Sequence, residues 1–387
     1  MRILMLLSRF PYPLEKGDKL RAFNQLKTLS TKHEVYLCCF HEGKVTPEMM
    51  EPLKPYCRGI KVIELKKKHI VFNLVRSFMS GLPFQVGYFY SWGAQAMVNA
   101  MLVKHKPDAI YCQLIRTAEY ARRDNTPIKV LDYMDAFSKN VERRIRVAPF
   151  YLRPLLRIEH RRLLRYEREV APDFQSLSVI SAQDRDFLPL TNKTAVHIVP
   201  NGVDTTYFSP RASKPSYDLL FTGNLSYPPN VACAELLARE VMPILLRKRP
   251  GTSLLIAGAS PAKRVLDLQG KGVAVKGWTD DIRDYYAAAA VFCAPMTIGS
   301  GMQNKILEAM SMQLPCVTSS LVNNAIGASD GKEVLLADTV ETTVDKILQL
   351  LDDKELSARI AKAGQSFVRQ RFAWSSVASV FLNLFRK

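Results

Sequence analysis

The sequence lacks the cysteine and histidine patterns of disulfide-rich and metal-binding proteins. Its seven cysteines form no CxxC pair, and their odd number argues against a disulfide framework. Its six histidines show no HxH or HExxH spacing, so we expect no metal site. No GxGxxG follows an expected strand and no GxxxxGKS or GxxxxGKT occurs, which argues against a dehydrogenase and a P-loop NTPase. The cysteine pattern suits small buried side chains in a reducing cytoplasm.

The sequence also lacks an uninterrupted apolar run long enough to cross a membrane. Residues 77–103 carry no charged side chain, but six residues break the run: Gly81, Pro83, Gln85, Gly87, Gln95 and Asn99. A helix with so many breaks does not span a bilayer. We expect this stretch to be buried, and a partly exposed interfacial surface is the alternative. The apolar start, residues 1–7, has no cleavage site and is expected to be a first strand.

Length and composition indicate a globular protein with two domains. A chain of 387 residues exceeds one ordinary hydrophobic core. Apolar residues make up 48% of the chain and charged residues 23%, as in folded soluble proteins.

Positive charge is in excess and unevenly placed. The net charge is +18; residues 1–200 hold 33 Lys and Arg against 19 Asp and Glu, whereas residues 201–387 hold 21 against 17. Nine arginines lie between Arg143 and Arg168, interleaved with leucines and aromatic residues. Such a segment is typical of a helix on anionic lipid headgroups, and equally of a surface helix whose leucines enter the core. Nucleic acid is not an expected partner, because no zinc-finger, RNP-like or helix-turn-helix pattern accompanies the charge.

Expected strands and helices alternate through both halves. The first half has strands at 2–7, 34–40, 59–65, 109–114, 129–134 and 176–181, with a helix over 19–29 that begins at Gly17 and Asp18. The second half has strands at 218–223, 253–259, 273–278, 290–295, 315–320 and 333–337, separated by helices such as 230–248, 282–289 and 303–312. This alternation predicts two Rossmann-like domains, each a parallel sheet covered by helices. We expect their junction within residues 199–210 and the active site between them, beyond the carboxyl ends of the strands.

Residues 294–318 carry the most specific local pattern. A short apolar segment runs into a Gly-rich turn at 299–301, and that turn opens a helix bearing Asn304, Lys305 and Glu308. Glycines let backbone N–H groups approach an anion, a helix start adds partial positive charge, and Lys305 adds a full charge. Glu308 lies about one turn inside the helix, where it could accept hydrogen bonds from a sugar diol. The pattern favours a phosphate site; a plain strand-loop-helix connection is the alternative.

Six strings spread over the chain match the pattern of one family. They are SRFPYPLEKGDKLR, VLDYMDAFS, HIVPNGVDTTYFSP, LLFTGNLSYPPN, VKGWTDDIRDYYAAAAVFCAP and NKILEAMSMQLPCV. On these strings the chain resembles a family 4 glycosyltransferase of the GT-B type, related to the sugar transferases of bacterial exopolysaccharide gene clusters. The closing segment FAWSSVASVFLNLFRK is similar to the family's last helix, which packs back on the first domain.

The resemblance implies a fold, a domain division and a reaction. The fold is α/β of the GT-B type, with two Rossmann-like domains facing a central cleft. The acceptor-binding domain spans 1–200 plus the helix 372–387, and the nucleotide-sugar-binding domain spans 201–371. The reaction is transfer of a hexose from a UDP- or GDP-linked donor to an acceptor hydroxyl, with retention and without a metal or other cofactor. Its place is the synthesis of a cell-surface polysaccharide or exopolysaccharide.

The resemblance also implies a donor site. Glu308 matches the helix glutamate that binds the nucleotide ribose, and the amides of 299–302 match those that hold the distal phosphate. Trp278 matches the turn against the base, with a plain core tryptophan as the alternative. Gly17 matches the first-domain glycine loop over the donor phosphates. The full implied donor set is Gly17, Gly223, Asn224, Trp278, Gly299, Ser300, Gly301, Met302, Asn304, Lys305 and Glu308.

Two positions depart from the family pattern. Many members have a glutamate on the donor sugar where this chain has Ser300, and an arginine on the diphosphate where it has Asn224. A leaving diphosphate develops negative charge, so a cation or dipole must stabilise it. Lys305 is our candidate for that role.

The acceptor site rests on fewer residues. Asp135 stands near the place of a family histidine that faces the sugar, and its carboxylate could accept a proton from the acceptor hydroxyl or bind sugar hydroxyls. Capping of the following turn is the alternative. Asp18 and Arg21 complete the expected acceptor set, with simple N-capping as the alternative for Asp18. Asp135 and Lys305 are therefore the expected catalytic residues, and we nominate no nucleophile.

Two other functions stay open from the sequence. A sugar-nucleotide epimerase of the same fold would need no second substrate. A non-catalytic membrane-bound scaffold would account for the departures at Ser300 and Asn224. For the transferase, the expected partners are a nucleotide sugar, a sugar or lipid-linked oligosaccharide acceptor and an anionic membrane surface. The expected location is the cytoplasm, peripheral on the inner face of the cell membrane.

Overall fold

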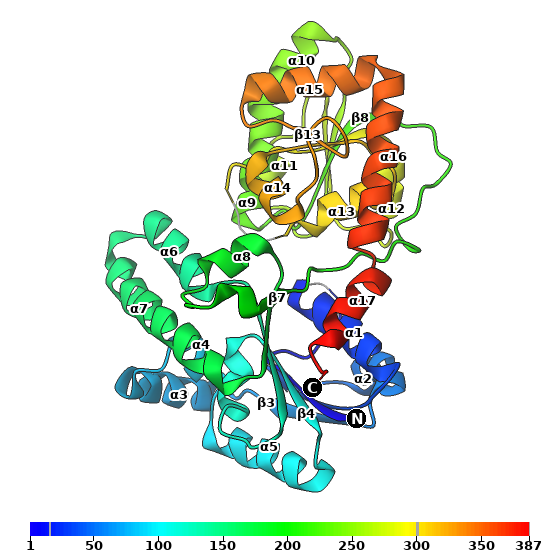
Figure 1. The fold of residues 1–387 in the computed structure, drawn as a ribbon. Helices are drawn as coiled ribbons and strands as arrows, with labels where there is room; N and C mark the ends of the chain where they lie inside the picture. Colours follow the sequence, from blue (N-terminus) through cyan, green and yellow to red (C-terminus); the bar gives the residue numbers. More distant parts are fainter. Residues whose placement is uncertain (15–16, 299–301, 387) are drawn as a thin grey trace. The chain divides into compact units, whose positions relative to one another are not determined.

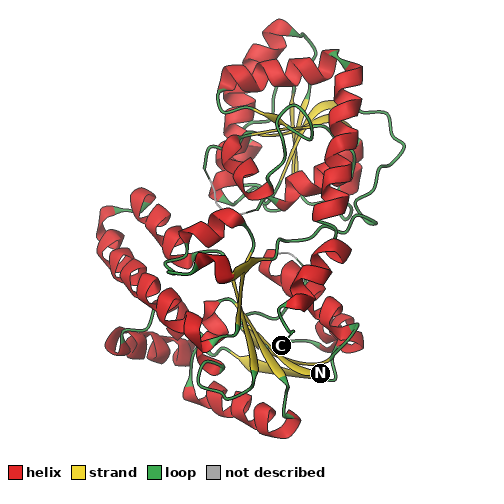
Figure 2. Ribbon diagram, viewed as in Figure 1, coloured by secondary structure: helices red, strands yellow, loops and turns green. Residues whose placement is uncertain are grey.

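Two parallel β-sheets organise the chain, one in each of two units (Figure 1). The computed structural model describes residues 1–14, 17–298 and 302–386. The first unit comprises Met1–Pro200 and Ala378–Lys387, and the second comprises Asn201–Val377. Helices flank the sheet in each unit (Figure 2). The expected α/β class with two parallel sheets is confirmed.

The first sheet has the strand order β3-β2-β1-β4-β5-β6-β7. Its strands are β1 (Arg2–Leu7), β2 (Glu34–His41), β3 (Gly59–Glu64), β4 (Ala109–Gln113), β5 (Ile128–Met134), β6 (Ser176–Val179) and β7 (Val196–Ile198). All neighbouring strands are parallel; Leu4 of β1, for example, pairs with Tyr36 and Ile110. β4 and β5 are buried along their whole length, as strands covered on both faces are. β7 is not predicted from the sequence, because its three residues make no recognisable apolar run.

Helices surround this sheet. They are α1 (Gly17–Ser30), α2 (Pro47–Met50), α3 (Lys67–Ser80), α4 (Phe84–Gly87), α5 (Trp92–His105), α6 (Phe137–Val147), α7 (Arg153–Val170) and α8 (Ala182–Phe187). Short 3-10 turns include Ile115–Tyr120 and Phe150–Leu152. The arginine-rich segment forms α6 and α7; α7 buries Leu163 and Tyr166 and exposes most of its arginines, so it is a surface helix with an apolar inner face.

The end of the chain packs in the first unit. α17 (Trp374–Asn383) begins in the second unit and ends in the first. Phe381 and Phe385 lie against Tyr111, with ring centroids 5.4 and 6.2 Å away. The Ser176 hydroxyl donates to the carbonyl of Leu384 at 2.9 Å. These contacts bury the last turns of the chain beside β4 and β6.

α3 packs with its polar side inward. Asn73 and Ser77 are 3% and 0% exposed, whereas five apolar side chains of the same helix are 57–82% exposed. They are Val71, Phe72, Val75, Phe78 and Met79. Ser77 must lie inside because α4 approaches closely: a Cβ on Gly87 would stand 1.5 Å from its hydroxyl oxygen. The expectation that residues 77–103 are buried is therefore wrong for Phe78 and Met79, and also for Trp92 and Val103, which are more than 70% exposed.

The second sheet has the strand order β10-β9-β8-β11-β12-β13. Its strands are β8 (Tyr217–Thr222), β9 (Leu254–Ala257), β10 (Val273–Lys276), β11 (Ala289–Ala294), β12 (Cys316–Thr318) and β13 (Leu335–Leu336). Its helices are α9 (Pro228–Leu236), α10 (Met242–Lys248), α11 (Lys263–Leu266), α12 (Arg283–Ala287), α13 (Asn304–Ser311), α14 (Ser320–Ile326), α15 (Val340–Asp352) and α16 (Lys354–Arg371). A π-helical turn, Leu237–Val241, joins α9 to α10, so the expected helix over 230–248 is continuous.

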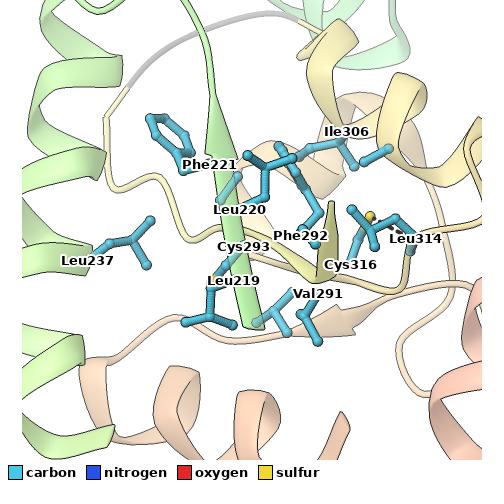
Figure 3. Close-up of a cluster of buried hydrophobic side chains, with 14 of the residues drawn as sticks. Leu219, Leu220, Phe221, Leu237, Val291, Phe292, Cys293, Ile306, Leu314 and Cys316 are labelled. Carbon is cyan, nitrogen blue, oxygen red and sulfur yellow. Dashed lines mark hydrogen bonds between the residues drawn. The ribbon is translucent and has the colours of Figure 1, made fainter. Parts of the chain in front are cut away.

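A dense apolar core fixes β8, β11 and α13 to one another (Figure 3). Leu220, Phe292 and Ile306 are fully buried within it. Each such side chain contributes about 1.5–3 kcal/mol when removed from water. Cys293 and Cys316 pack here as small apolar side chains. The core thereby sets α13 at a fixed height against the carboxyl ends of the central strands.

Candidate functional site

Lys305 lies where β8 ends and α13 begins. Its ammonium donates a hydrogen bond to Oδ1 of Asn230 and stands over the Phe221 ring, 4.7 Å from the centroid. Gly223 follows β8, and a Cβ there would lie 2.7 Å from the Asn230 amide nitrogen and 3.1 Å from the Lys305 ammonium. Only glycine leaves room for both groups.

Burial brings the pKa of Lys305 close to neutral pH. Desolvation lowers the pKa of its ammonium to about 8, against the smaller opposing effects of Cys233 and Glu308. A bound phosphate would raise this pKa again, because an opposite charge favours the protonated form. The site is therefore suited to an anion.

Asn230 ties the loop after β8 to α13. Its Nδ2 donates to the carbonyl of Asn224 at 2.9 Å, while its Oδ1 accepts from Lys305. The Asn224 side chain turns into its own loop, where Oδ1 accepts from the Ser226 amide at 3.0 Å and hydroxyl at 2.7 Å. Asn224 thus shapes the loop, and Lys305 supplies the cation at this strand end.

Glu308 lies one turn further along α13 and is partly buried. Its Oε2 accepts a hydrogen bond of 2.9 Å from the Tyr286 hydroxyl, which also lies 3.0 Å from the Thr222 hydroxyl. Burial raises the pKa of Glu308, and the bond from Tyr286 and the charge of Lys305 oppose that rise. Sequence reasoning misses both Asn230 and Tyr286, because each acts through contacts far apart in the chain.

The remaining donor residues fall in three groups. Asn304 is partly buried, and its Oδ1 is enclosed with no hydrogen-bond partner among the described residues. Met302 packs on the core of the second unit, whereas Trp278 is 72% exposed and is not the core tryptophan of the alternative. Gly17 is the first residue of α1 in the first unit. Gly299, Ser300 and Gly301 lie outside the described residues.

In the first unit, Asp135 lines a pocket of about 320 Å³. Asp135 follows β5, and its Oδ2 accepts from the Asn140 amide at 3.0 Å. Its Oδ1 is buried without a hydrogen-bond partner in the described part of the chain. Burial, reinforced by the nearby carboxylate of Asp184, raises the pKa of Asp135 to about 7. A carboxylate with this pKa is suited to exchange a proton near neutral pH.

Asp18 lines the same pocket, paired with Arg9 at 2.7 Å. The structure thus brings Asp18 and Asp135 together from β1–α1 and β5–α6. It does not place Arg21 with them. Arg21 is 1% exposed and donates to Asp132 at 2.7 Å and to the carbonyl of Pro200 at 3.1 Å. We assign it to the core in place of the acceptor role expected for it.

Asp132 and Arg21 form a buried ion pair that orders the first unit. Gln25, Tyr111 and Ser178 donate to the carboxylate of Asp132 at 2.8–3.1 Å. Burial alone would raise the pKa of Asp132, but the charge of Arg21 and the hydrogen bonds from Arg21, Gln25 and Tyr111 together outweigh burial, and the pKa is lowered. These contacts hold α1 against β4, β5 and β6. Removing either partner of the ion pair would leave the other as an uncompensated buried charge.

The described residues contain neither a cluster of metal ligands nor a membrane-spanning helix. No three His, Cys, Asp or Glu side chains among them come together as metal ligands would. None of their helices has both the length and the apolar character needed to cross a bilayer.

Comparison with known proteins places the second unit in a family. Residues 216–353 match the family described as glycosyl transferases group 1. A 44.6 kDa protein of the cps region of Klebsiella pneumoniae is 20% identical over 407 aligned positions, covering 100% of this chain and 99% of that protein. The phosphatidyl-myo-inositol mannosyltransferase of Mycobacterium tuberculosis is 28% identical over 203 positions, 48% of this chain and 53% of that one. The chain therefore matches the mannosyltransferase over about half of its length.

Solved structures share the whole fold. Sucrose-phosphate synthase from Thermosynechococcus elongatus superimposes with a TM-score of 0.71 at 16% identity, covering 100% of this chain and 98% of that one. Anabaena HepE in complex with UDP gives 0.68 at 16% identity, covering 99% of each chain. The expected GT-B fold is confirmed. The chain has the GT-B fold and carries a glycosyl transferases group 1 domain at residues 216–353.

Proposed function

We propose that the protein transfers a sugar from a nucleotide-sugar donor to an acceptor hydroxyl, with retention and without a metal. The observation that carries the proposal is the group formed by Lys305, Asn230 and Glu308 at the carboxyl end of β8, inside the group 1 domain. It sets a cation for the diphosphate beside a carboxylate for the ribose. In this proposal the second unit binds the donor and the first unit binds the acceptor.

Lys305 stabilises the leaving diphosphate. Negative charge develops on that group as the glycosidic bond breaks, and a fixed, partly desolvated ammonium acts strongly on it. The side-chain carbonyl oxygen of Asn304, which has no hydrogen-bond partner among the described residues, adds a hydrogen-bond acceptor to the donor site. A UDP complex of HepE and the GDP-mannose dependence of a mycobacterial relative support a UDP- or GDP-linked donor.

Asp135 receives the acceptor hydroxyl in the pocket that it shares with Asp18. Its unpartnered Oδ1 offers an acceptor site for the hydroxyl proton. Asp135 takes the hydroxyl proton as the acceptor oxygen bonds to the sugar and the bond from the sugar to the diphosphate breaks. Asp135 then releases the proton to solvent, and no covalent sugar–protein bond is required.

We place the reaction in cell-surface polysaccharide synthesis at the inner face of the cell membrane. The similarity to the Klebsiella cps-region protein supports the polysaccharide role. The apolar face of α3 supports the membrane, together with exposed Phe150 and Tyr151 and the exposed arginines of α7. Apolar side chains enter the interface while arginines hold anionic headgroups. Sedimentation with phosphatidylglycerol vesicles should be strong at low salt and weak with phosphatidylcholine alone; no salt-sensitive binding would remove this part of the proposal.

A two-step experiment tests the transferase. A thermal-shift screen of nucleotides and nucleotide sugars first identifies the donor, because a ligand that binds only the folded state raises Tm. Nucleotide release is then followed with and without glycan or glycolipid acceptors. Release that requires an acceptor supports transfer, whereas conversion of the donor alone indicates an epimerase. If the protein binds no nucleotide sugar, the result supports the alternative of a non-catalytic scaffold.

A further inference from the structure

A second pocket in the first unit is rich in positive charge. It has a volume of about 510 Å³ and lies at the carboxyl ends of β1 and β2. The described residues that line it include three cations, Arg9, Lys19 and Arg116, against the carboxylate of Glu42. Arg9, Gln85 and Arg116 also line the smaller pocket that holds Asp135. The two pockets therefore adjoin, and two guanidinium groups stand at their boundary.

Arg116 is held in place but not fully used. Its guanidinium lies over the rings of Phe137 and Phe89, 4.9 and 5.4 Å from their centroids, and donates to Oε1 of Gln85 at 3.0 Å. Its Nε is buried and has no hydrogen-bond partner in the described residues. Burial lowers the pKa of Arg116 to about 10, and the like charge of Arg9 adds to the effect. Arg9 pairs with Asp18 at 2.7 Å, and the charges of Asp18 and Asp135 oppose the lowering of the Arg116 pKa. An anion between Arg116 and Arg9 would further offset the burial of Arg116 and its repulsion from Arg9.

The wall of this pocket is continuous with the apolar face of α3. Phe84 and Leu74 line the pocket, and Leu74 belongs to α3. The outer side of the same helix exposes Phe72, Val75 and its other apolar residues. A molecule with an anionic head and an apolar tail fits this arrangement, because the head meets the arginines while the tail follows α3.

We propose that this pocket binds the anionic group, a phosphate or carboxylate, of an amphiphilic acceptor. The hydroxyl to be glycosylated then lies in the adjoining pocket beside Asp135. The inference rests on the proposed function, since it names the class of acceptor for that reaction. It adds Arg116 and Arg9 to the residues that determine specificity.

Octyl phosphate is the probe, with octyl glucoside as the neutral amphiphile and inorganic phosphate as the bare anion. Binding is measured by calorimetry below the micelle concentration, for wild type, Arg116→Gln and Arg116→Lys. Arg123→Gln removes the same charge from an exposed position outside the pocket. Arg9→Gln gives a second test, because the Arg9 side chain is 42% exposed and its replacement leaves the core intact.

We expect octyl phosphate to bind wild type at least tenfold more tightly than either control ligand. Arg116→Gln should weaken the binding of octyl phosphate at least tenfold, because a charged hydrogen bond is lost, and Arg9→Gln should weaken it severalfold. Arg116→Lys should lose less affinity than Arg116→Gln, and Arg123→Gln should lose none. Equal binding of octyl phosphate and octyl glucoside, or wild-type binding by Arg116→Gln and Arg9→Gln, overturns the proposal. If inorganic phosphate binds as tightly as octyl phosphate, the proposal that the acceptor is amphiphilic is refuted.

Nucleotide binding, measured on the same samples, separates the two proposals. If wild type binds a nucleotide sugar but not octyl phosphate, the proposal of an anionic acceptor is refuted and the proposed transferase function stands. If the protein binds octyl phosphate but no nucleotide sugar, the proposed transferase function is refuted and an anion-binding pocket remains.

Discussion

Replacing Lys305 by arginine and by alanine tests whether its ammonium stabilises the donor diphosphate. Burial lowers the pKa of this ammonium to about 8, while Asn230 holds it in place. In the free enzyme about 90% of it is charged at pH 7 and about 10% at pH 9. The charged form is the active one, so activity is present below pH 8 and lost above it. We expect kcat/KM for the donor to fall about tenfold from pH 7 to pH 9.

The two variants separate the charge from the shape of the site. Arginine stays protonated across this range, so Lys305→Arg should lose the alkaline decline even if its rate at pH 7 is lower. Alanine removes the cation at every pH, and kcat should drop by about 10²–10³, as when one electrostatic donor is removed from a reacting oxyanion.

The assay follows nucleotide release from the selected nucleotide sugar between pH 6 and pH 9 at saturating acceptor. Lys362→Ala, on the exposed side of α16, controls for loss of a lysine in the same unit. Thermal melts at each pH show that the variants stay folded. Wild-type kcat/KM in Lys305→Ala, or an unchanged alkaline decline in Lys305→Arg, would refute the role of Lys305.

Three further predictions test other parts of the account. Glu308→Gln should raise the nucleotide Kd about tenfold by calorimetry, because a charged acceptor of the ribose is lost; an unchanged Kd contradicts ribose binding. The pKa of Asp135 is raised to about 7, so this carboxyl costs stability as pH rises from about 4 through 7. In urea titrations, Asp135→Asn should therefore be more stable relative to wild type at pH 8 than at pH 5, while its acceptor-dependent nucleotide release falls. An equal difference in unfolding free energy between variant and wild type at both pH values would count against the raised pKa. Phe72→Ser with Val75→Ser should weaken sedimentation with phosphatidylglycerol vesicles severalfold without lowering Tm, and Leu266→Ser, an exposed apolar residue of the second unit, should not; equal losses in both would deny α3 a special role.

Much of the fold follows from local apolar runs. Strands such as Ala109–Gln113 and Ile128–Met134 are buried on both faces, and most of their residues are apolar, so they can be predicted from the sequence whatever surrounds them. β7 escapes prediction because three residues carry too little pattern. The exposed face of α3 escapes it as well, because the same apolar residues would fit a core helix. Their exposure depends on Ser77 packing against Gly87.

Some residues of the candidate site can be predicted from the sequence, and others cannot. Lys305 and Glu308 stand at a fixed spacing on one helix, and that spacing is visible in the sequence. Asn230, Tyr286 and Arg116 become part of the site only when distant strands come together, so no local signal marks them. Arg21 illustrates the reverse case. Its place near the start of α1 suggests a ligand contact, but folding brings it onto Asp132 in the core.

A crystal structure with the nucleoside diphosphate selected by the thermal-shift screen tests the central claim most directly. We expect a phosphate oxygen within about 3 Å of the Lys305 ammonium and the ribose hydroxyls at hydrogen-bond distance from Glu308. A nucleotide bound elsewhere, for example in the pocket of about 400 Å³ lined by Thr297, Ser319 and Asp338, would contradict it.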